Sequence, residues 1–169
     1  MGKVAVLIED LYNVHEALYP YYRMKEAGFE TFFVGPKRKE YKSKEGVVIN
    51  SDLSIDEVNF EEFDAVIVPG GYAPDRLRRD ERILEFVRKM YDSGKIVAAI
   101  CHAGWVLISA GILKGKKVTG FHAIKDDLKN AGAEYLDEEV VVDGNIITSR
   151  VPQDLPAFCK KIVEILNSR

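Results

Sequence analysis

The sequence predicts a doubly wound α/β domain, in which helices cover both faces of a mostly parallel sheet. Two short runs, residues 64–68 (DAVIV) and 95–100 (KIVAAI), are apolar along nearly their whole length. Such runs are typical of strands that are buried on both sides. Segments with apolar residues at helical spacing alternate with them, as in parallel β-α-β units.

The elements of the first half follow from local patterns. Residues 2–8 form an apolar run, which predicts the first strand, and residues 14–27 carry apolar residues at helical spacing up to a glycine, a common helix terminator. A second strand at 29–34 ends at a Gly-Pro pair. The basic stretch 37–46 (KRKEYKSKEG) is expected to be a solvated loop or hairpin tip, with a short strand at 47–50.

The second half continues this alternation and then changes character. Further elements are expected at 64–68 (strand), 80–93 (helix), 95–100 (strand) and 102–110 (helix). Next, residues 140–142 pair with 145–148 across a tight Asp143-Gly144 turn. An amphipathic helix at 152–167 closes the chain, and we expect a single domain over residues 1–169.

Composition and charge narrow the function classes. The 169 residues carry a net charge of −3, so no broad basic field favours nucleic acid as the main ligand. No apolar run approaches the length of a membrane span, and the N-terminal run fits a strand better than a signal peptide. The chain has two cysteines, and no Cys/His cluster has zinc-ligand spacing. We therefore expect a cytoplasmic protein with no metal and no cofactor.

A reactive pair, Cys101 and His102, follows the predicted strand at 95–100. Ligands of open α/β sheets gather beyond the carboxyl ends of the strands, where helix N-termini point outward. The small neighbouring residues suit a tight turn that exposes a nucleophile, and a helix N-terminus lowers the pKa of a thiol. These features predict that Cys101 is a nucleophile, whereas free cysteines in general are more often buried and inert.

A glycine turn, VPGGYAPD at residues 68–75, follows the strand at 64–68. The amides of Gly70 and Gly71 are expected to point beyond the same edge of the sheet as Cys101. There they could donate hydrogen bonds to a developing oxyanion. A plain loop after a strand is the alternative interpretation.

Four stretches of the chain carry a resemblance to a known family. They are YPYYRMKEAG, VPGGYAPDRLR, AAICHAGWVLISAG and VVVDGNIITSRVPQDL, and in register they resemble the PfpI intracellular-protease family almost end to end. That family belongs to the superfamily of the parkinsonism-associated protein and the class I glutamine amidotransferases. The resemblance implies a flavodoxin-like fold with the cysteine on a nucleophile elbow. It also implies a homo-oligomer, either a dimer or a hexamer of three dimers.

The resemblance implies roles for individual residues. Cys101 matches the nucleophile, His102 the general base, and Glu16 the glutamate that hydrogen-bonds the cysteine sulfur. Asp75 matches an acidic residue that reaches across a subunit interface to orient the histidine of the neighbouring chain. Gly71 and the amide of His102 would form the oxyanion hole. Because adjacent side chains on a turn diverge, we expect no hydrogen bond between Cys101 and His102, so that a carboxylate must aim the ring.

Other positions modify this assignment. A carboxyl at Glu16 would raise the pKa of the thiol when ionised and favour the thiolate when protonated, although a glutamate is also common in a first helical turn. Residues expected to shape the pocket are Tyr12, His15, Trp105 and His122. The family usually has Gly-Pro after the histidine, whereas this chain has Ala-Gly-Trp, which leaves the substrate open.

Three functions are compatible with these residues. The first is conversion of 2-oxoaldehydes such as methylglyoxal to 2-hydroxy acids without glutathione, together with release of glycated amines from proteins. The second is an intracellular cysteine peptidase whose Cys101, His102 and Asp75 meet across a subunit interface. The third is a redox-sensing or chaperone-like stress protein in which Cys101 oxidises. The expected partners are thus a small aldehyde, a peptide or a glycated protein.

Overall fold

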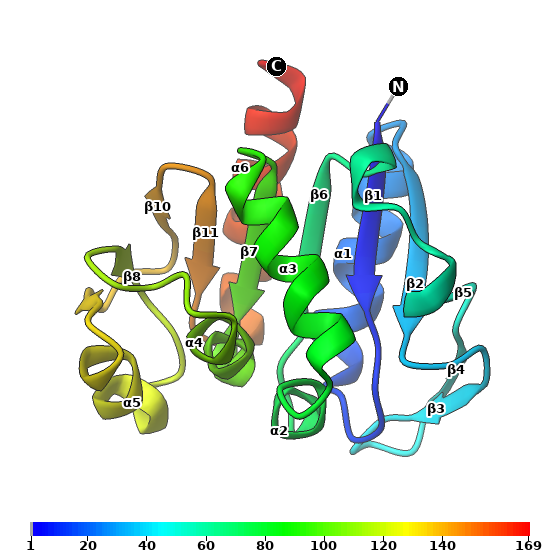
Figure 1. The fold of residues 1–169 in the computed structure, drawn as a ribbon, viewed down its shortest axis with the longest axis horizontal. Helices are drawn as coiled ribbons and strands as arrows, with labels where there is room; N and C mark the ends of the chain where they lie inside the picture. Colours follow the sequence, from blue (N-terminus) through cyan, green and yellow to red (C-terminus); the bar gives the residue numbers. More distant parts are fainter. Residues whose placement is uncertain (1) are drawn as a thin grey trace.

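The computed structural model describes residues 2–169 (Figure 1). Seven strands form the main sheet: β1 (Lys3–Leu7), β2 (Glu30–Gly35), β5 (Leu53–Ser54), β6 (Ala65–Val68), β7 (Ile96–Ile100), β10 (Val141–Asp143) and β11 (Ile146–Ser149). Two small sheets pair β3 (Glu40–Lys42) with β4 (Val48–Asn50) and β8 (Lys117–Val118) with β9 (Glu134–Tyr135). The α-helices are α1 (Val14–Glu26), α2 (Ala73–Leu77), α3 (Glu81–Asp92), α4 (Gly104–Ala110), α5 (Lys125–Asn130) and α6 (Leu155–Asn167).

The main sheet confirms the predicted doubly wound architecture. Its strand order is β10-β11-β7-β6-β1-β2-β5, and every neighbouring pair is parallel except β10 with β11. The order runs outward in both directions from the centre, so β6 and β1 lie side by side although 57 residues separate the end of β1 from the start of β6. This is a switch point of the kind at which ligands bind in open α/β sheets.

Alternate residues of each strand feed two hydrophobic clusters on opposite faces of the sheet. In β1, Ala5 and Leu7 belong to the cluster that includes apolar side chains of α3 and α4. Val4 and Val6 belong to the other cluster, which includes side chains of α1 and α6. The two helix layers in front of and behind the sheet are visible in Figure 1. Burial on both faces explains why these strands lack a polar face.

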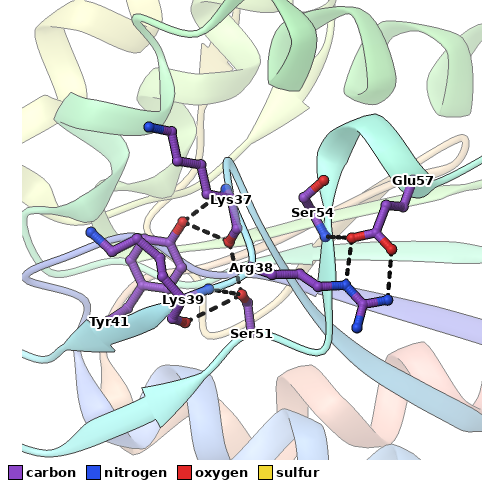
Figure 2. A network of polar contacts seen from close by, with 7 residues as sticks. All are labelled: Lys37, Arg38, Lys39, Tyr41, Ser51, Ser54 and Glu57. Carbon is purple, nitrogen blue, oxygen red and sulfur yellow. Dashed lines mark hydrogen bonds and ion pairs between the residues drawn. The ribbon is translucent and has the colours of Figure 1, made fainter.

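The basic stretch after β2 forms part of an ordered hairpin. The sequence left a solvated loop and a hairpin tip open, and the second alternative is the observed one. Antiparallel pairing joins β3 to β4. Figure 2 shows how the segment before β3 is held: the Tyr41 hydroxyl donates to the carbonyl of Lys37 and accepts from its N–H, both at 3.0 Å. The Ser51 hydroxyl donates to the same carbonyl at 2.8 Å, and Arg38 forms a two-pronged ion pair with Glu57.

Two predicted elements differ in detail. In the C-terminal hairpin Asp143 pairs with Ile146, so the two-residue loop is Gly144-Asn145 and the expected Asp143-Gly144 turn is wrong by one residue. Gly144 has φ 59°, the left-handed backbone that such tight loops require. The expected helix at 102–110 begins as a 3-10 turn, Cys101–Ala103, and only Gly104–Ala110 is α-helical. Within residues 2–169, no helix is both long and apolar enough to cross a membrane.

Candidate active site

Three neighbouring strands end at the same edge of the sheet, and the candidate site lies there. Cys101 directly follows β7, the Gly70-Gly71 pair follows β6, and the segment after β1 leads into α1. An isolated antiparallel bridge joins Tyr12, in the segment after β1, to Gly71. The main-chain N–H of Asn13 also donates to the carbonyl of Gly70 at 3.1 Å. The segment after β1 and the glycine turn after β6 are therefore joined through their backbones.

Cys101 occupies a strained turn. Its φ of 62° lies in the left-handed region, which among the described non-glycine residues only Leu11 shares. The carbonyl of Cys101 is hydrogen-bonded in this turn, since the N–H of Phe121 donates to it at 3.1 Å. Cys101 has 8% of its surface exposed, whereas Cys159, on α6, is fully buried. Cys101 is therefore the more accessible of the two cysteines.

Gly70 lies where Cys101 and Glu16 approach one another. A Cβ built on Gly70 would lie 2.5 Å from Glu16 Oε1 and 2.8 Å from Cys101 Cβ, so no side chain fits at this position. The N–H of Gly70 donates to Glu16 Oε1 at 2.8 Å. The expectation that this amide serves the oxyanion hole is therefore wrong, because the carboxyl of Glu16 already accepts its hydrogen.

Glu16 is fully buried in the first turn of α1. Its backbone is fixed by Asn13, the residue that caps the helix: Asn13 Oδ1 accepts from the N–H groups of His15 and Glu16 at 3.0 and 3.2 Å. The second carboxyl oxygen, Oε2, has no hydrogen-bond partner within residues 2–169. Burial raises the pKa of Glu16 to about 8, although the Gly70 hydrogen bond acts in the opposite direction. At neutral pH the carboxyl is thus protonated.

The thiol of Cys101 experiences opposing influences. Burial, followed by the charge of an ionised Glu16, raises its pKa, whereas backbone hydrogen bonds from His102 and Gly71 lower it. The sequence-based expectation that a helix N-terminus lowers the pKa is wrong in its net direction, because burial outweighs the hydrogen bonds and α4 begins only at Gly104. Protonation of Glu16 removes the repulsive part of this balance at neutral pH.

His102 lies against the sulfur, contrary to expectation. Its Nδ1 is 3.3 Å from Cys101 Sγ, so the two adjacent side chains do not diverge. The left-handed φ of Cys101 and the 3-10 turn that follows place both side chains on the same side. Burial lowers the pKa of the half-buried imidazole, and the nearby His122 adds to this effect. The ring is therefore a neutral base at pH 7.

Two aromatic rings hold the His102 imidazole. Phe121 stacks on it with ring centroids 5.0 Å apart, and Trp105 meets it edge to face at 5.2 Å. Trp105 is itself fixed, because its Nε1 donates to Asp127 Oδ2 at 2.9 Å. Sequence reasoning did not identify Phe121, which comes from the segment after β8. In the sequence, the neighbouring His122 was the only residue of that segment that suggested a place in the pocket.

Asp75 lies on α2 with an exposed side chain that forms an ion pair with Arg79, one helical turn away. Within residues 2–169 it makes no hydrogen bond to His102. The role across a subunit interface that the resemblance implies for Asp75 involves a second chain and stays a prediction.

The remaining pocket candidates occupy different environments. Tyr12 is fully buried, and its hydroxyl donates to the carbonyl of Val47 at 2.7 Å, so it supports the backbone rather than lining an opening. His15 and His122 are exposed, and Trp105 is half-buried. His122 contacts Phe121, with ring centroids 4.4 Å apart. In the part of the chain that the structure describes, no three His, Cys, Asp or Glu side chains are grouped to hold a metal ion.

Comparison with known proteins identifies the family of the chain. The DJ-1/PfpI family model matches residues 2–165. The deglycase PfpI of Pyrococcus furiosus is 46% identical over 164 residues, covering 97% of this chain and 99% of its own. The protein/nucleic acid deglycase 2 of Escherichia coli is 44% identical over 169 residues, covering 98% of each chain.

Among solved structures, a two-domain protein of Anabaena variabilis with DJ-1/ThiJ/PfpI-like and ferritin-like domains superposes with a TM-score of 0.97 at 46% identity. The match covers 99% of this chain but 48% of that protein, so the chain spans about half its length. This likeness confirms the flavodoxin-like sandwich. Because the family model matches almost the whole of this chain, the chain belongs to the DJ-1/PfpI family.

Proposed function

We propose that this protein is a cysteine-dependent enzyme that acts on reactive carbonyl compounds. It removes aldehyde adducts from proteins and converts free 2-oxoaldehydes such as methylglyoxal to 2-hydroxy acids without glutathione. The observation that carries the proposal is the meeting of a strained Cys101 and a protonated, half-satisfied Glu16 at Gly70. Relatives of more than 40% identity that bear the name deglycase support it.

Activation of the sulfur follows from the unpartnered oxygen of Glu16. Because Gly70 N–H holds Oε1, the proton of the neutral acid belongs on Oε2, from which it can donate toward the sulfur. With the backbone N–H groups of His102 and Gly71, this gives the thiolate three donors. Glu16 therefore offsets part of the rise in the pKa of the Cys101 thiol that burial causes.

The first chemical step is addition of the thiolate to the aldehyde carbon. A sulfur electron pair forms the C–S bond, and the C=O π pair moves to oxygen, which accepts a proton and completes a hemithioacetal. The N–H groups of His102 and Gly71, which already face Cys101, are placed to stabilise the developing alkoxide. In this step the N–H groups of Gly71 and His102 would act as the oxyanion hole expected from the sequence.

The second step is an internal redox exchange that needs no outside oxidant. A base removes the proton of the former aldehyde carbon, and a proton is delivered to the neighbouring ketone carbon, which is reduced as the first carbon is oxidised to a thioester. Water then hydrolyses the thioester, releasing the 2-hydroxy acid and the free thiol. The neutral His102 imidazole and the Glu16 carboxyl are the groups that transfer these protons.

Deglycation uses the same adduct. When the aldehyde carbon is already bound to a protein amine, that carbon passes to Cys101 while its C–N bond breaks. The amine leaves with a proton supplied by Glu16. The released protein is unmodified, and the carbon fragment follows the steps above.

The test is turnover of methylglyoxal with lactate measured as product. The wild-type protein and the variant Cys159→Ser should form lactate at similar rates, because Cys159 is fully buried away from the site. Cys101→Ser and Glu16→Gln should lose turnover by at least about 100-fold. Lactate formation by Cys101→Ser at the wild-type rate would overturn the proposal.

An intracellular peptidase is the second candidate, favoured by the 3.3 Å contact between Cys101 and His102. In that mechanism Asp75 would exchange Arg79 for the histidine of another subunit in a cytoplasmic homo-oligomer. Casein cleavage that Asp75→Ala impairs, with methylglyoxal turnover unchanged, would support this candidate. A holdase effect on unfolding client proteins that survives Cys101→Ser would instead support the stress-protein alternative.

A further inference from the structure

A groove of about 640 Å³ lies beside the site, between the tip of the β3–β4 hairpin and α2. Residues from three segments line it. Asp10 and Leu11 come from the connection after β1, Lys42, Lys44 and Glu45 from the hairpin, and Arg76 from α2. The expected catalytic residues do not line it, so its contents are not explained by the reaction at Cys101.

The groove has more positive than negative charges. Three cations, Lys42, Lys44 and Arg76, face two carboxylates. Glu45 forms an ion pair with Lys44, Nζ to Oε2 3.1 Å, and Asp10 Oδ1 accepts the main-chain N–H of Lys42 at 3.0 Å. Within the described chain, the side chains of Lys42 and Arg76 have neither an ion pair nor a hydrogen bond. These two cations are therefore available to a ligand.

Leu11 connects the groove with the catalytic edge. Its N–H donates to the carbonyl of Lys42, and its own carbonyl accepts from Tyr72 N–H, both at 2.8 Å. A Cβ built on Gly71 would lie 2.7 Å from the same Leu11 carbonyl. Leu11 therefore lines the groove and also neighbours Gly71, whose N–H faces Cys101.

The hairpin tip is hydrogen-bonded to the connection after β1 and to the start of α1, the helix that carries Glu16. Lys44 N–H donates to the carbonyl of Tyr12 at 3.0 Å, and Glu45 Oε1 accepts the N–H of Val14, at the start of α1, at 3.0 Å. The charge of Lys44 lowers the pKa of both Cys101 and Glu16, whereas Glu45 raises that of Glu16, so charged groups of the groove lie near enough to influence the site. A ligand held by the hairpin would therefore keep a fixed position relative to the sulfur.

We propose that this groove binds a carboxylate or phosphate group of the substrate whose carbonyl reacts at Cys101. Arg76, on α2, offers the planar fork that suits both oxyanions, and Lys42, on the hairpin, adds a second cation. The proposal rests on the proposed function and narrows its substrate class. Preferred substrates are aldehyde adducts that carry an oxyanion a few bonds from the reacting carbon.

Two hemithioacetals of methylglyoxal provide the test, one formed with N-acetylcysteine and the other with N-acetylcysteine amide. They differ only in the charge of one group. In each, the reacting carbon passes to Cys101 while its bond to the small thiol breaks, and the thiol leaves with a proton. The wild-type protein should show the higher kcat/KM for the carboxylate, and each of Arg76→Gln and Lys42→Gln should reduce the ratio of the two kcat/KM values by about two- to fivefold. Added salt should reduce the wild-type ratio in the same direction.

Lys37→Gln is the matched control, because this lysine of the same basic stretch lies outside the groove and its contacts in Figure 2 are made by its main chain. It should leave the ratio unchanged. Turnover of both substrates with equal kcat/KM in the wild-type protein, or an equal loss of preference in Lys37→Gln, would overturn the inference while leaving the proposed function intact.

Phosphate binding tests the groove without turnover. Titration of the wild-type protein with inorganic phosphate, followed by the shift in the ³¹P resonance, should give saturable binding. The double variant Lys42→Gln/Arg76→Gln should weaken it by about four- to twentyfold, whereas Lys37→Gln should not. Absence of saturable binding, together with equal kcat/KM for the two hemithioacetals, would exclude both oxyanions from the groove.

Discussion

The main-chain N–H of Gly70 donates to Oε1 of Glu16 at 2.8 Å and leaves Oε2 of this fully buried carboxyl without a partner. A buried carboxylate oxygen with no donor is unfavourable, and a proton on that oxygen relieves it. Gly70 thereby determines which oxygen carries the proton. Burial raises the pKa of Glu16 to about 8, even though the hydrogen bond from Gly70 lowers it.

The first prediction concerns stability against pH. Glu16 has a pKa of about 8 in the folded protein, whereas an unfolded glutamate titrates near 4.3. Between these values the folded state holds a proton that the unfolded state has lost, so raising the pH favours unfolding. The free energy of unfolding should fall by about 1.4 kcal/mol per pH unit from roughly pH 5 to pH 8 relative to Glu16→Gln. Urea titrations of both proteins across this range measure the difference, and parallel pH profiles would refute the protonated carboxyl.

The second prediction separates a clash from backbone strain at Gly71. With φ 81°, any side chain here is strained, and a Cβ would also lie 2.5 Å from the main-chain nitrogen of Asn13. Gly111 has nearly the same φ, 76°, and nothing within 4 Å of a built Cβ. Gly111→Ala should cost about 1 kcal/mol, and Gly71→Ala at least about 2 kcal/mol with loss of turnover. Equal losses in urea unfolding would mean that the Tyr12–Gly71 bridge can shift to admit a methyl group.

The architecture was accessible from the sequence because it depends on local patterns. Strands buried on both faces leave continuous apolar runs, and β1, β6 and β7 were found from these. The position of Glu16 at the catalytic edge also follows from the order of elements, since α1 starts just after β1. In contrast, α2 and α5 contain five and six residues, too few for a helical period to show.

The details of the site depended on packing and could not be predicted in this way. The pKa of Cys101 follows mainly from burial by side chains that are distant in the sequence, whereas the residue pattern indicated only the effect of the helix end. The Cys101–His102 contact depends on one left-handed φ, which no residue pattern reveals. Phe121, which stacks on His102, lies 19 residues further along the chain. Its loop carries no motif that would indicate this contact.

The third prediction tests Asn13 as the residue that positions Glu16. Asn13 Oδ1 accepts from the N–H groups of His15 and Glu16, so Asn13→Ala should cost about 1 kcal/mol in urea unfolding. It should also reduce kcat/KM with methylglyoxal by about tenfold, because the carboxyl loses its fixed backbone. Asn59 caps a 3-10 turn in the same manner away from the site, so Asn59→Ala should lower stability and leave kcat/KM unchanged. An activity loss common to both variants would indicate a general effect of reduced stability.

The last prediction concerns how the reactivity of Cys101 depends on pH. Below its pKa, a thiol with no titrating neighbour gains about tenfold in thiolate per pH unit. Glu16 changes this above pH 8, because its ionisation adds a repulsive charge that raises the pKa of the thiol as the pH increases. The rate of alkylation by iodoacetamide should therefore rise steeply up to about pH 8 and then flatten in the wild-type protein, whereas in Glu16→Gln it should continue to rise. Mass spectrometry of the peptide that contains Cys101 measures this rate separately from the buried Cys159. Parallel profiles in the two proteins would show that the carboxyl does not couple to the sulfur, and the role proposed for Glu16 in forming the thiolate would be lost.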